Sequence, residues 1–202
     1  MTDNIYEKKR KKMGRIFYLM GKSASGKDTV YKRLLEEYPK LCPLVLYTTR
    51  PMRDGEAQGV EYHFVPQERM EYFKEKGKVI ESRVYQTVAG PWIYATIDDG
   101  GMAREDRDYL AIGTLESYKK VRDYFGKERV VPIYIVIEDG LRLERALKRE
   151  RQQKEPNYLE MCRRFLADEE DFSLEKLKQC GIEIVYENES LESCMEEIRK
   201  II

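Results

Sequence analysis

The chain of 202 residues has few of the residues that metal centres and disulfide frameworks require. It contains one histidine, His63, and four cysteines, and no two cysteines have the C-x-x-C spacing. Structural zinc sites take four cysteine or histidine ligands, usually in closely spaced pairs, so this sequence does not predict one. We expect the four cysteines to be free, reduced thiols.

The sequence also lacks an excess of either charge and long apolar runs. Lysine and arginine together number 37, as do aspartate and glutamate, so no net field attracts the molecule to nucleic acid or a membrane surface. No apolar run approaches the roughly 20 residues that a membrane-spanning helix needs, and the N-terminus has no apolar stretch typical of a signal peptide. We therefore expect a cytoplasmic monomer or homodimer without nucleic-acid or membrane partners.

The first 12 residues differ from the rest of the chain. They are polar and basic, and a second methionine, Met13, directly precedes the first apolar run. We interpret residues 1–12 as a disordered tail or as residues before the true start, with a basic interaction arm as the alternative. Residues 13–202 have the length of one domain with a sizeable core.

Apolar runs and helical periodicity alternate along this domain. Core strands are predicted at 15–20, 42–47, 108–113, 130–137 and 182–187. Helices are predicted after Gly26, from Thr114, from near Leu141 and after a cap at Ser190, and the polar break at 152–157 divides the third of these in two. This order predicts an α/β fold with a parallel, doubly wound sheet that binds ligands at the carboxyl ends of its strands.

The stretch from about 45 to 107 has a different character, because short strands and turns replace the longer helices. Strands are predicted at 60–65, 78–84 and 92–96, with a short helix at 67–77. We interpret this stretch as an inserted subdomain.

The segment GKSASGKDT, residues 21–29, has the glycine and lysine spacing of a phosphate-binding loop between a strand and a helix. Such a loop presents backbone N–H groups to an anion at a helix N-terminus, and Lys27 is placed to reach the β and γ phosphates of a nucleotide. We therefore predict that the loop binds ATP. The predicted ATP-binding residues are Gly21, Lys22, Ser23, Ala24, Ser25, Gly26, Lys27, Asp28 and Thr29.

A second motif, YTTRPMRDGEAQGVEYHF, follows in the predicted insertion. Its arginines, Arg50 and Arg53, have a planar guanidinium geometry that suits bidentate contact with a phosphate group. Solvated loop arginines are the alternative interpretation of the same two residues.

Together, the loop, the pattern TTRPxRxGExxGxxYxFV and the later glutamate in VIE resemble guanylate kinases. The resemblance extends from about Gly14 to the C-terminus and is weakest between 83 and 116. It implies a three-layer P-loop NTPase fold and magnesium-dependent phosphoryl transfer from ATP to GMP or dGMP. The implied parts are a core (13–44, 108–140 and 165–202), a nucleoside-monophosphate-binding insertion (45–107) and a small helical lid (141–164).

The resemblance also implies roles for individual residues. Arg50, Arg53, Tyr62 and Tyr94 are expected to bind the phosphate of GMP, with Glu56 orienting the arginines. Glu81 and Thr96 are expected to bind the guanine base, and Asn188 the adenine of ATP. Catalysis is assigned to Lys27 and to three lid arginines, Arg145, Arg149 and Arg164, although pairing with nearby glutamates also explains those lid residues.

This sequence departs from the family pattern at several positions. Asp28 stands in the place of a hydroxyl residue that binds magnesium, and Ala111 and Gly113 stand where the family has carboxylates. Our hypothesis is that Asp28 supplies the carboxylate ligand to Mg²⁺ that the strand no longer supplies. Alternatively, Asp28 only caps the N-terminus of the following helix or places a negative charge there. Leu46 replaces a serine that contacts guanine, and about four extra residues separate Glu81 from Tyr94.

These departures keep two other functions open. A related family with the same GKD letters phosphorylates ribose 1,5-bisphosphate, but it lacks the complete arginine motif that is present here. Guanylate kinase-like modules that bind phosphopeptides without catalysis are the second alternative, but those modules generally lose the phosphate loop.

Overall fold

The computed structural model describes residues 14–53, 55–87, 90–100 and 107–202. The expected tail, residues 1–12, lies outside the described residues. The four cysteines are all described, and each is free, as expected.

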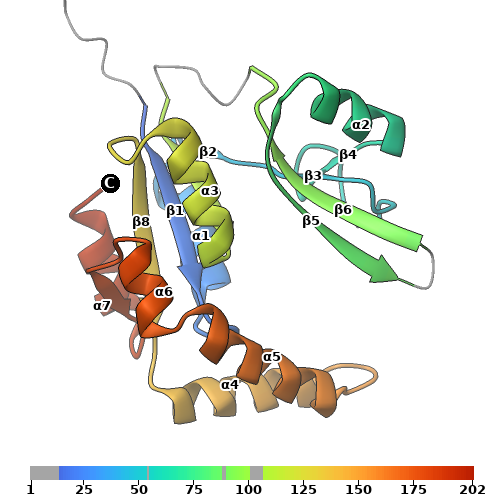
Figure 1. Cartoon of the computed structure of the whole chain (residues 1–202). Helices are drawn as coiled ribbons and strands as arrows, with labels where there is room; N and C mark the ends of the chain where they lie inside the picture. Colours follow the sequence, from blue (N-terminus) through green and yellow to red (C-terminus); the bar gives the residue numbers. More distant parts are fainter. Residues whose placement is uncertain (1–13, 54, 88–89, 101–106) are drawn as a thin grey trace, which may run out of the picture.

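A parallel sheet of five strands, in the order β2-β7-β1-β8-β9, forms the centre of the core, as predicted. Its strands are β1 (Ile16–Gly21), β2 (Cys42–Pro43), β7 (Tyr109–Gly113), β8 (Val130–Val136) and β9 (Val185–Glu187). The helices that follow them are α1 (Lys27–Glu37), α3 (Leu115–Phe125), α4 (Asp139–Arg151), α5 (Tyr158–Asp171), α6 (Leu174–Gln179) and α7 (Leu191–Arg199). Figure 1 shows helices on both faces of the sheet.

Side chains of β1 alternate between two hydrophobic clusters because successive residues of a strand point to opposite faces. Tyr18 packs in the cluster that includes Leu115 and Val121 of α3. Leu19, one residue along, packs in the cluster with Leu34 of α1 and others. This alternation produces the three layers and leaves the carboxyl end of β1 leading into the predicted phosphate loop.

The insertion forms a second, mixed sheet of four strands in the order β4-β3-β6-β5. Its elements are β3 (Tyr47–Thr48), β4 (His63–Phe64), α2 (Gln67–Glu75), β5 (Val79–Thr87) and β6 (Gly90–Ile97). Met70 and Phe73 of α2 pack with Ile93 and Ala95 of β6. One face of this sheet is therefore covered by α2, and the residues that alternate with the packed ones lie on the other face.

Two strand predictions in this part of the chain were too long. The apolar run at 42–47 divides into β2 and β3, which belong to different sheets, because the chain leaves the core sheet after Leu44 donates to the carbonyl of Leu110. The run at 60–65 is a strand only over β4. It begins in a turn, in which the N–H of Val60 donates to the carbonyl of Ala57.

Three predicted helix starts have different outcomes. Thr114 caps α3 as predicted, with its side chain accepting from the N–H of Ser117. α4 begins at Asp139, two residues before the predicted start, because the carboxylate of Glu138 caps it. Ser190 occupies the N-cap position of α7, but its side chain makes no capping hydrogen bond. The last core strand is shorter than predicted and spans β9 alone.

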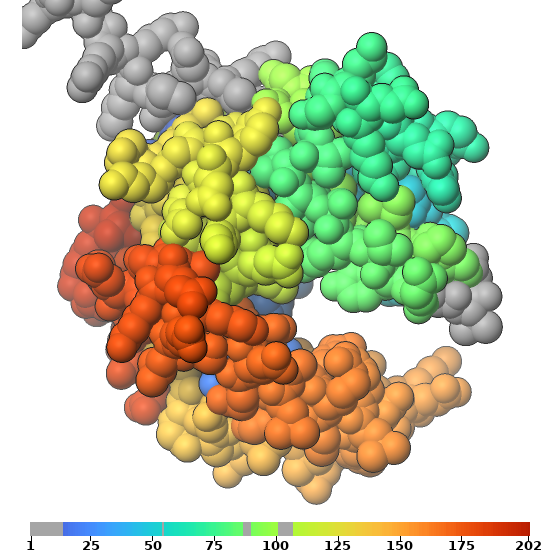
Figure 2. Space-filling view, viewed as in Figure 1, coloured from blue at the N-terminus to red at the C-terminus, as the bar shows by residue number. Residues whose placement is uncertain are grey.

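The helices α4 and α5 extend from the core beneath the second sheet (Figure 1). In the space-filling view, a deep recess separates these orange helices from the green surface of the insertion, with blue atoms of the N-terminal core at its base (Figure 2). No described helix is long and apolar enough to cross a membrane.

Candidate active site

The loop after β1 has the backbone conformation of an anion-binding turn. Ala24 and Gly26 have positive φ values of 63° and 88°, and α1 begins immediately afterwards at Lys27. A Cβ atom on Gly26 would lie 2.2 Å from the Nδ2 atom of Asn188, so this position requires glycine. No side chain caps the start of α1 at Gly26, so its N-terminus offers N–H groups to an anion.

Asn188 holds this loop from the opposite side. Its side chain is buried, and Nδ2 donates to the carbonyl of Ser25 over 2.8 Å. The carbonyl of Asn188 in turn accepts from Nη2 of Arg145 at 3.1 Å, and the carbonyl of Glu189 accepts from the same atom at 3.4 Å. The described contacts of Asn188 and Arg145 thus position the loop and the base of α4, and their predicted roles toward ATP stay predictions.

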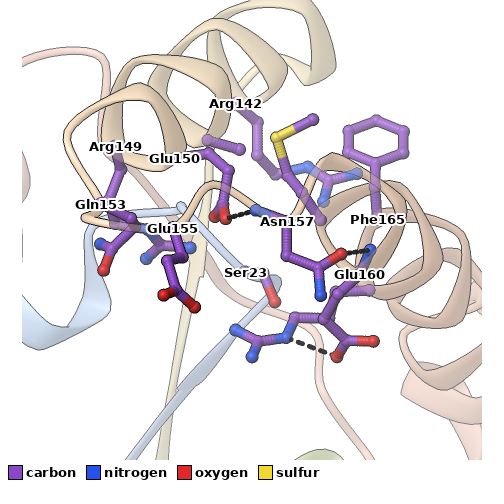
Figure 3. A pocket seen from close by; sticks show the side chains of 12 residues that line it. Ser23, Arg142, Arg149, Glu150, Gln153, Glu155, Asn157, Glu160 and Phe165 are labelled. Atoms are coloured by element: carbon purple, nitrogen blue, oxygen red, sulfur yellow. Dashed lines mark hydrogen bonds and ion pairs between the residues drawn. The ribbon is translucent and has the colours of Figure 1, made fainter.

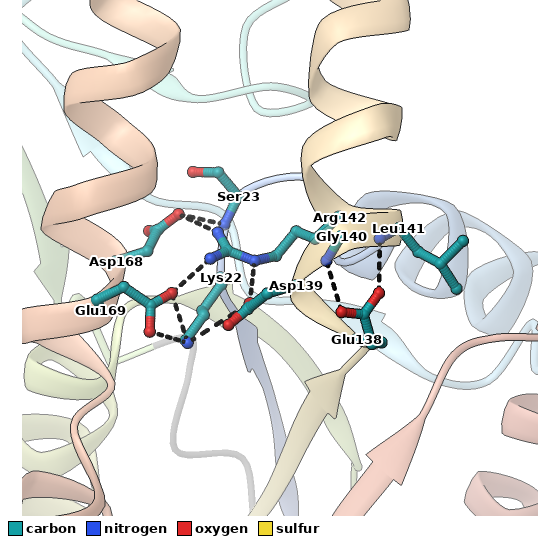
Figure 4. A network of polar contacts seen from close by, with 9 residues as sticks. All are labelled: Lys22, Ser23, Glu138, Asp139, Gly140, Leu141, Arg142, Asp168 and Glu169. Atoms are coloured by element: carbon teal, nitrogen blue, oxygen red, sulfur yellow. Dashed lines mark hydrogen bonds and ion pairs between the residues drawn. The ribbon is translucent and has the colours of Figure 1, made fainter.

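Carboxylates of α4 and α5 engage the first half of the loop (Figure 4). Nζ of Lys22 lies 2.6 and 2.7 Å from the two carboxylate oxygens of Glu169, and the N–H of Ser23 donates to Oδ2 of Asp168 over 2.7 Å. Arg142, which is 1% exposed, lies between them and donates to Asp139, Asp168 and Glu169. The carboxylate of Asp168 therefore accepts from a loop N–H group that the motif predicts to bind phosphate.

Lys27 and Asp28 are placed differently from Lys22. Nζ of Lys27 lies 3.7 Å from Oδ2 of Asp28, and the side chain of Asp28 is 72% exposed. Among the described pairs, Lys27 has no contact with a carboxylate of α5, so its charge remains available to a ligand.

Two of the three predicted lid arginines line one cavity of about 370 Å³ between α4 and α5 (Figure 3). Arg149 comes from α4 and Arg164 from α5, and Ser23 of the loop also lines the cavity. Nε of Arg164 donates to Glu160 over 3.0 Å, while no hydrogen bond or ion pair within the described part of the chain engages the guanidinium of Arg149. The structure thus brings Arg149 and Arg164 to one cavity beside the loop and directs Arg145 to the carbonyls of residues 188 and 189.

The arginine motif of the insertion is built around Glu56. Its carboxylate accepts from Nη1 and Nη2 of Arg50 at 3.0 and 2.7 Å, and from the backbone N–H of Arg53 at 2.8 Å. These contacts lower the pKa of Glu56 and raise that of Arg50. The guanidinium of Arg50 has five N–H donors, so donors remain for a phosphate after the contacts to Glu56 and to the carbonyl of Pro51.

The two predicted phosphate-binding tyrosines lie beside this arginine. The ring centroids of Tyr62 and Tyr94 are 5.4 Å apart, and the guanidinium carbon of Arg50 lies 5.5 Å from the Tyr62 centroid. Burial raises the pKa of Tyr62, so its hydroxyl remains protonated at neutral pH and available as a donor. The structure therefore brings Arg50, Glu56, Tyr62 and Tyr94 into one cluster with the backbone of Arg53.

Glu81 and Thr96 pair across β5 and β6, on the sheet face not covered by α2. Both are buried, and Oγ1 of Thr96 donates to Oε1 of Glu81 over 2.9 Å. Nε of Arg83 lies 3.5 Å from Oε2 of the same glutamate. A buried carboxylate with one short hydrogen bond retains acceptor capacity for a ligand donor.

Comparison with known proteins places the chain in a family. The guanylate kinase family model matches residues 13–202. The chain belongs to the guanylate kinase family.

Individual guanylate kinases match shorter segments. The chain is 32% identical over 123 residues to a guanylate kinase of Nitratidesulfovibrio vulgaris, which covers 60% of this chain and 58% of that protein. It is 36% identical over 112 residues to one of Neisseria meningitidis serogroup A, with 54% and 53% covered. The chain therefore spans less than two thirds of the length of these curated relatives. A crystal structure of guanylate kinase from Anaplasma phagocytophilum matches 94% of this chain with a TM-score of 0.62 and 22% identity, which supports the fold.

The guanylate kinase motif departs at Gly113 for a structural reason. A Cβ atom there would lie 2.3 Å from the hydroxyl oxygen of Tyr18, which is buried and donates to Ser117 over 2.7 Å. A carboxylate at position 113 is therefore incompatible with the packing of Tyr18. Leu46, another departure from the family pattern, packs partly buried against the core cluster that includes Tyr18.

Sequence reasoning missed five residues of this candidate site. They are Asp139, Arg142, Asp168, Glu169 and Arg83. The first four belong to charged stretches in or next to two predicted helices, and only the packing of α4 against α5 brings them together beside the loop. For Arg83, the two-residue spacing from Glu81 on a predicted strand was the available signal, because it places both side chains on one face.

Proposed function

We propose that this protein transfers the γ-phosphoryl group of ATP to GMP or dGMP, in a magnesium-dependent reaction. The observation that carries this proposal is the presence of two separate sites that each offer N–H donors and a cationic side chain to a phosphate group. One is the loop that contains Lys27, and the other is the cluster of Arg50, Glu56 and Tyr62. Phosphoryl transfer between two phosphates needs little covalent help from protein and depends on alignment and charge neutralisation.

On the donor side, the loop N–H groups and Lys27 hold the β and γ phosphates. Arg149 and Arg164 line the cavity next to Ser23 and supply positive charge to the moving phosphoryl group when the recess closes. The contacts of Lys22 and Ser23 with Glu169 and Asp168 must be exchanged for phosphate contacts when ATP binds.

On the acceptor side, Arg50, Arg53 and the two tyrosines hold the phosphate of GMP. Glu81 accepts hydrogen bonds from the N–H groups of guanine, with Thr96 holding its carboxylate in place. Adenine has an acceptor, N1, where guanine has the N1–H donor, so the buried carboxylate of Glu81 disfavours AMP.

The residues present fit magnesium through oxygen ligands alone. Mg²⁺ commonly binds one or two carboxylates together with substrate phosphates and waters. Asp28 offers an exposed carboxylate at the N-terminus of α1, beside Lys27 and the phosphate loop. Among the described residues, no group of three or more His, Cys, Asp or Glu side chains forms a separate metal site. When bound, the ion neutralises phosphate charge, and the part of Asp28 is to hold it beside the loop.

A coupled assay with ATP and Mg²⁺ tests the proposed function directly. The acceptors offered are GMP, dGMP, IMP, AMP, UMP and ribose 1,5-bisphosphate. Rapid turnover of GMP and dGMP is expected. Preferred turnover of ribose 1,5-bisphosphate would favour the related sugar kinases instead, and tight ATP binding without turnover of any acceptor would favour a binding module.

The substitution Asp28→Asn tests the magnesium ligand. We expect the Mg²⁺ concentration for half-maximal rate to rise about tenfold, because the amide oxygen carries no charge, while nucleotide binding without metal changes little. Initial rates across a Mg²⁺ titration, with ATP binding measured in EDTA, separate the two effects. Asp171→Asn, an exposed carboxylate at the end of α5, serves as the control. An unchanged Mg²⁺ dependence would leave Asp28 with the role of a helix-terminal charge.

A further inference from the structure

Arg83 is a charged residue beside the candidate base site, and the family resemblance assigns it no role. It lies on β5 opposite Tyr94 of β6, and Glu81 lies opposite Thr96 on the same strands. Because side chains two residues apart share a face, Arg83 and Glu81 both lie on the sheet face that α2 leaves uncovered.

The contact between Arg83 and Glu81 leaves donors unused. Their 3.5 Å separation makes an ion pair, but Nε of Arg83 is buried and has no hydrogen-bond partner within the described residues. An arginine offers five N–H donors in a planar fork, and a buried donor without a partner is costly unless a ligand or water satisfies it. The side chain is 24% exposed, so a ligand can reach its guanidinium.

A carboxylate next to a guanidinium is the chemical complement of one purine edge. Guanine presents two donors, N1–H and the 2-amino group, next to two acceptors, O6 and N7. Arginine paired with O6 and N7 is the commonest specific contact that proteins make to guanine in DNA, whereas adenine places a 6-amino donor at the position of O6. Glu81 suits the donor half of guanine, and Arg83 suits the acceptor half.

We propose that Arg83 is a specificity-determining residue that donates to O6 and N7 of the acceptor base while Glu81 accepts from N1–H and the 2-amino group. This inference rests on the proposed function, because it assumes that the acceptor is a purine monophosphate bound with its base at Glu81. It assigns to Arg83 the discrimination between guanine and adenine at the 6-position.

Equilibrium binding to the full chain, without ATP, tests the assignment independently of turnover. The probes are GMP, 7-deaza-GMP, IMP and AMP, measured by calorimetry on the unaltered protein and on Arg83→Met and Arg83→Lys. 7-Deaza-GMP lacks only the N7 acceptor, and IMP lacks only the 2-amino donor. The unaltered protein is expected to prefer GMP to 7-deaza-GMP by about tenfold. In Arg83→Met this ratio falls to about one and the ratio of GMP to AMP also falls, while the ratio of GMP to IMP is retained. Arg83→Lys lies between, because an ammonium does not reproduce the planar fork.

Two controls keep the result interpretable. Arg33→Met, on the exposed side of α1, removes an arginine away from the base site. Thermal unfolding of each variant shows whether a loss of binding reflects a loss of folding.

Other outcomes overturn the inference in recognisable ways. An equal loss for all four nucleotides in Arg83→Met would assign Arg83 to the phosphate. A changed GMP to IMP ratio with an unchanged 7-deaza ratio would make it a positioning residue for Glu81. Selective GMP binding without turnover would contradict the proposed kinase and still support the assignment, whereas failure of the unaltered protein to bind GMP would overturn both.

Discussion

The two proposed phosphate sites of this molecule differ in how their charges are paired. At the donor loop, Lys22 and Arg142 carry two positive charges against three negative ones on Asp139, Asp168 and Glu169, which leaves a net charge of −1. At the acceptor cluster, Arg50 and Arg53 face Glu56, which leaves a net charge of +1.

The difference predicts that the two proposed sites bind phosphate by different routes. The acceptor site holds spare guanidinium donors in place, so binding GMP there needs little rearrangement. The donor site holds Lys22 and the Ser23 N–H against carboxylates, so ATP has to displace them. Lys27 lies outside this network of carboxylates from α4 and α5. The donor loop therefore has a first half, with Lys22, that is paired with carboxylates, and a second half, with Lys27, that is not.

The largest expected effect comes from removing Lys27. Lys27→Met should lower kcat for GMP phosphorylation by about a thousandfold, because the transferring phosphoryl group loses a positive charge that nothing else in the loop supplies. Lys22→Met should lower kcat by less than about tenfold, because Lys22 has to give up its contact with Glu169 to reach a phosphate, which offsets part of what it gains there. Steady-state kinetics with saturating GMP measure both. Similar losses of kcat in the two variants would contradict the proposed difference between Lys22, which is paired with Glu169, and Lys27, which is not.

A smaller effect is expected from the carboxylate that competes with phosphate. Asp168→Ala frees the N–H of Ser23 and removes a negative charge beside the triphosphate, so we expect ATP to bind about threefold to tenfold more tightly at low salt. The gain should shrink as salt is added. The variant should also unfold at a lower temperature, since the buried Arg142 loses one of its three partners.

Asp171→Ala is the matched control for this measurement, because Asp171 ends the same helix and is 61% exposed. Calorimetric titration with ATP in the absence of GMP isolates donor binding. Weaker ATP binding in Asp168→Ala would show that Asp168 organises the loop for phosphate and does not compete with it.

The same contrast between the sites explains how far the sequence could predict them. The Lys27–Asp28 and Arg50–Glu56 contacts are local, because their partners lie six residues apart or fewer. The spacing of these residues in the sequence is therefore enough to predict that they lie close together. The network around Arg142 joins residues 26 and 27 positions apart, and Lys22 lies 147 positions from Glu169. No periodicity along the chain encodes contacts at that separation.

The fold shows the same limit. Alternating strands and helices were enough to predict the parallel core sheet, and the motif letters were enough to predict the family, but neither predicted the division of residues 42–47 between two sheets. An apolar run predicts that its residues are buried, but not in which sheet they lie. Leu44 and Tyr47 are both buried, although they pack beside different sheets. The packing that excludes a side chain at Gly113 also depended on the position of Tyr18, which the sequence does not give.

The smallest expected effect tests whether the acceptor cluster is formed before any ligand binds. Hydrogen bonds from Arg50 and Arg53 lower the pKa of Glu56 from its usual value of 4.5. A lowered pKa in the folded state means that the pair stabilises the fold above pH 4.5 and that this contribution is lost as the pH falls through the lowered value. Glu56→Gln should therefore unfold a few degrees below the unaltered protein near pH 7, and this difference in unfolding temperature should persist to about pH 4.5 and disappear only below it.

Thermal unfolding without ligand from pH 7 to pH 2.5 measures the gap, with Glu68→Gln on α2 as the control. A gap that closes above pH 5 would mean that Glu56 is not held by the arginines in the free protein, and the acceptor site would then need ligand to assemble, as the donor site does.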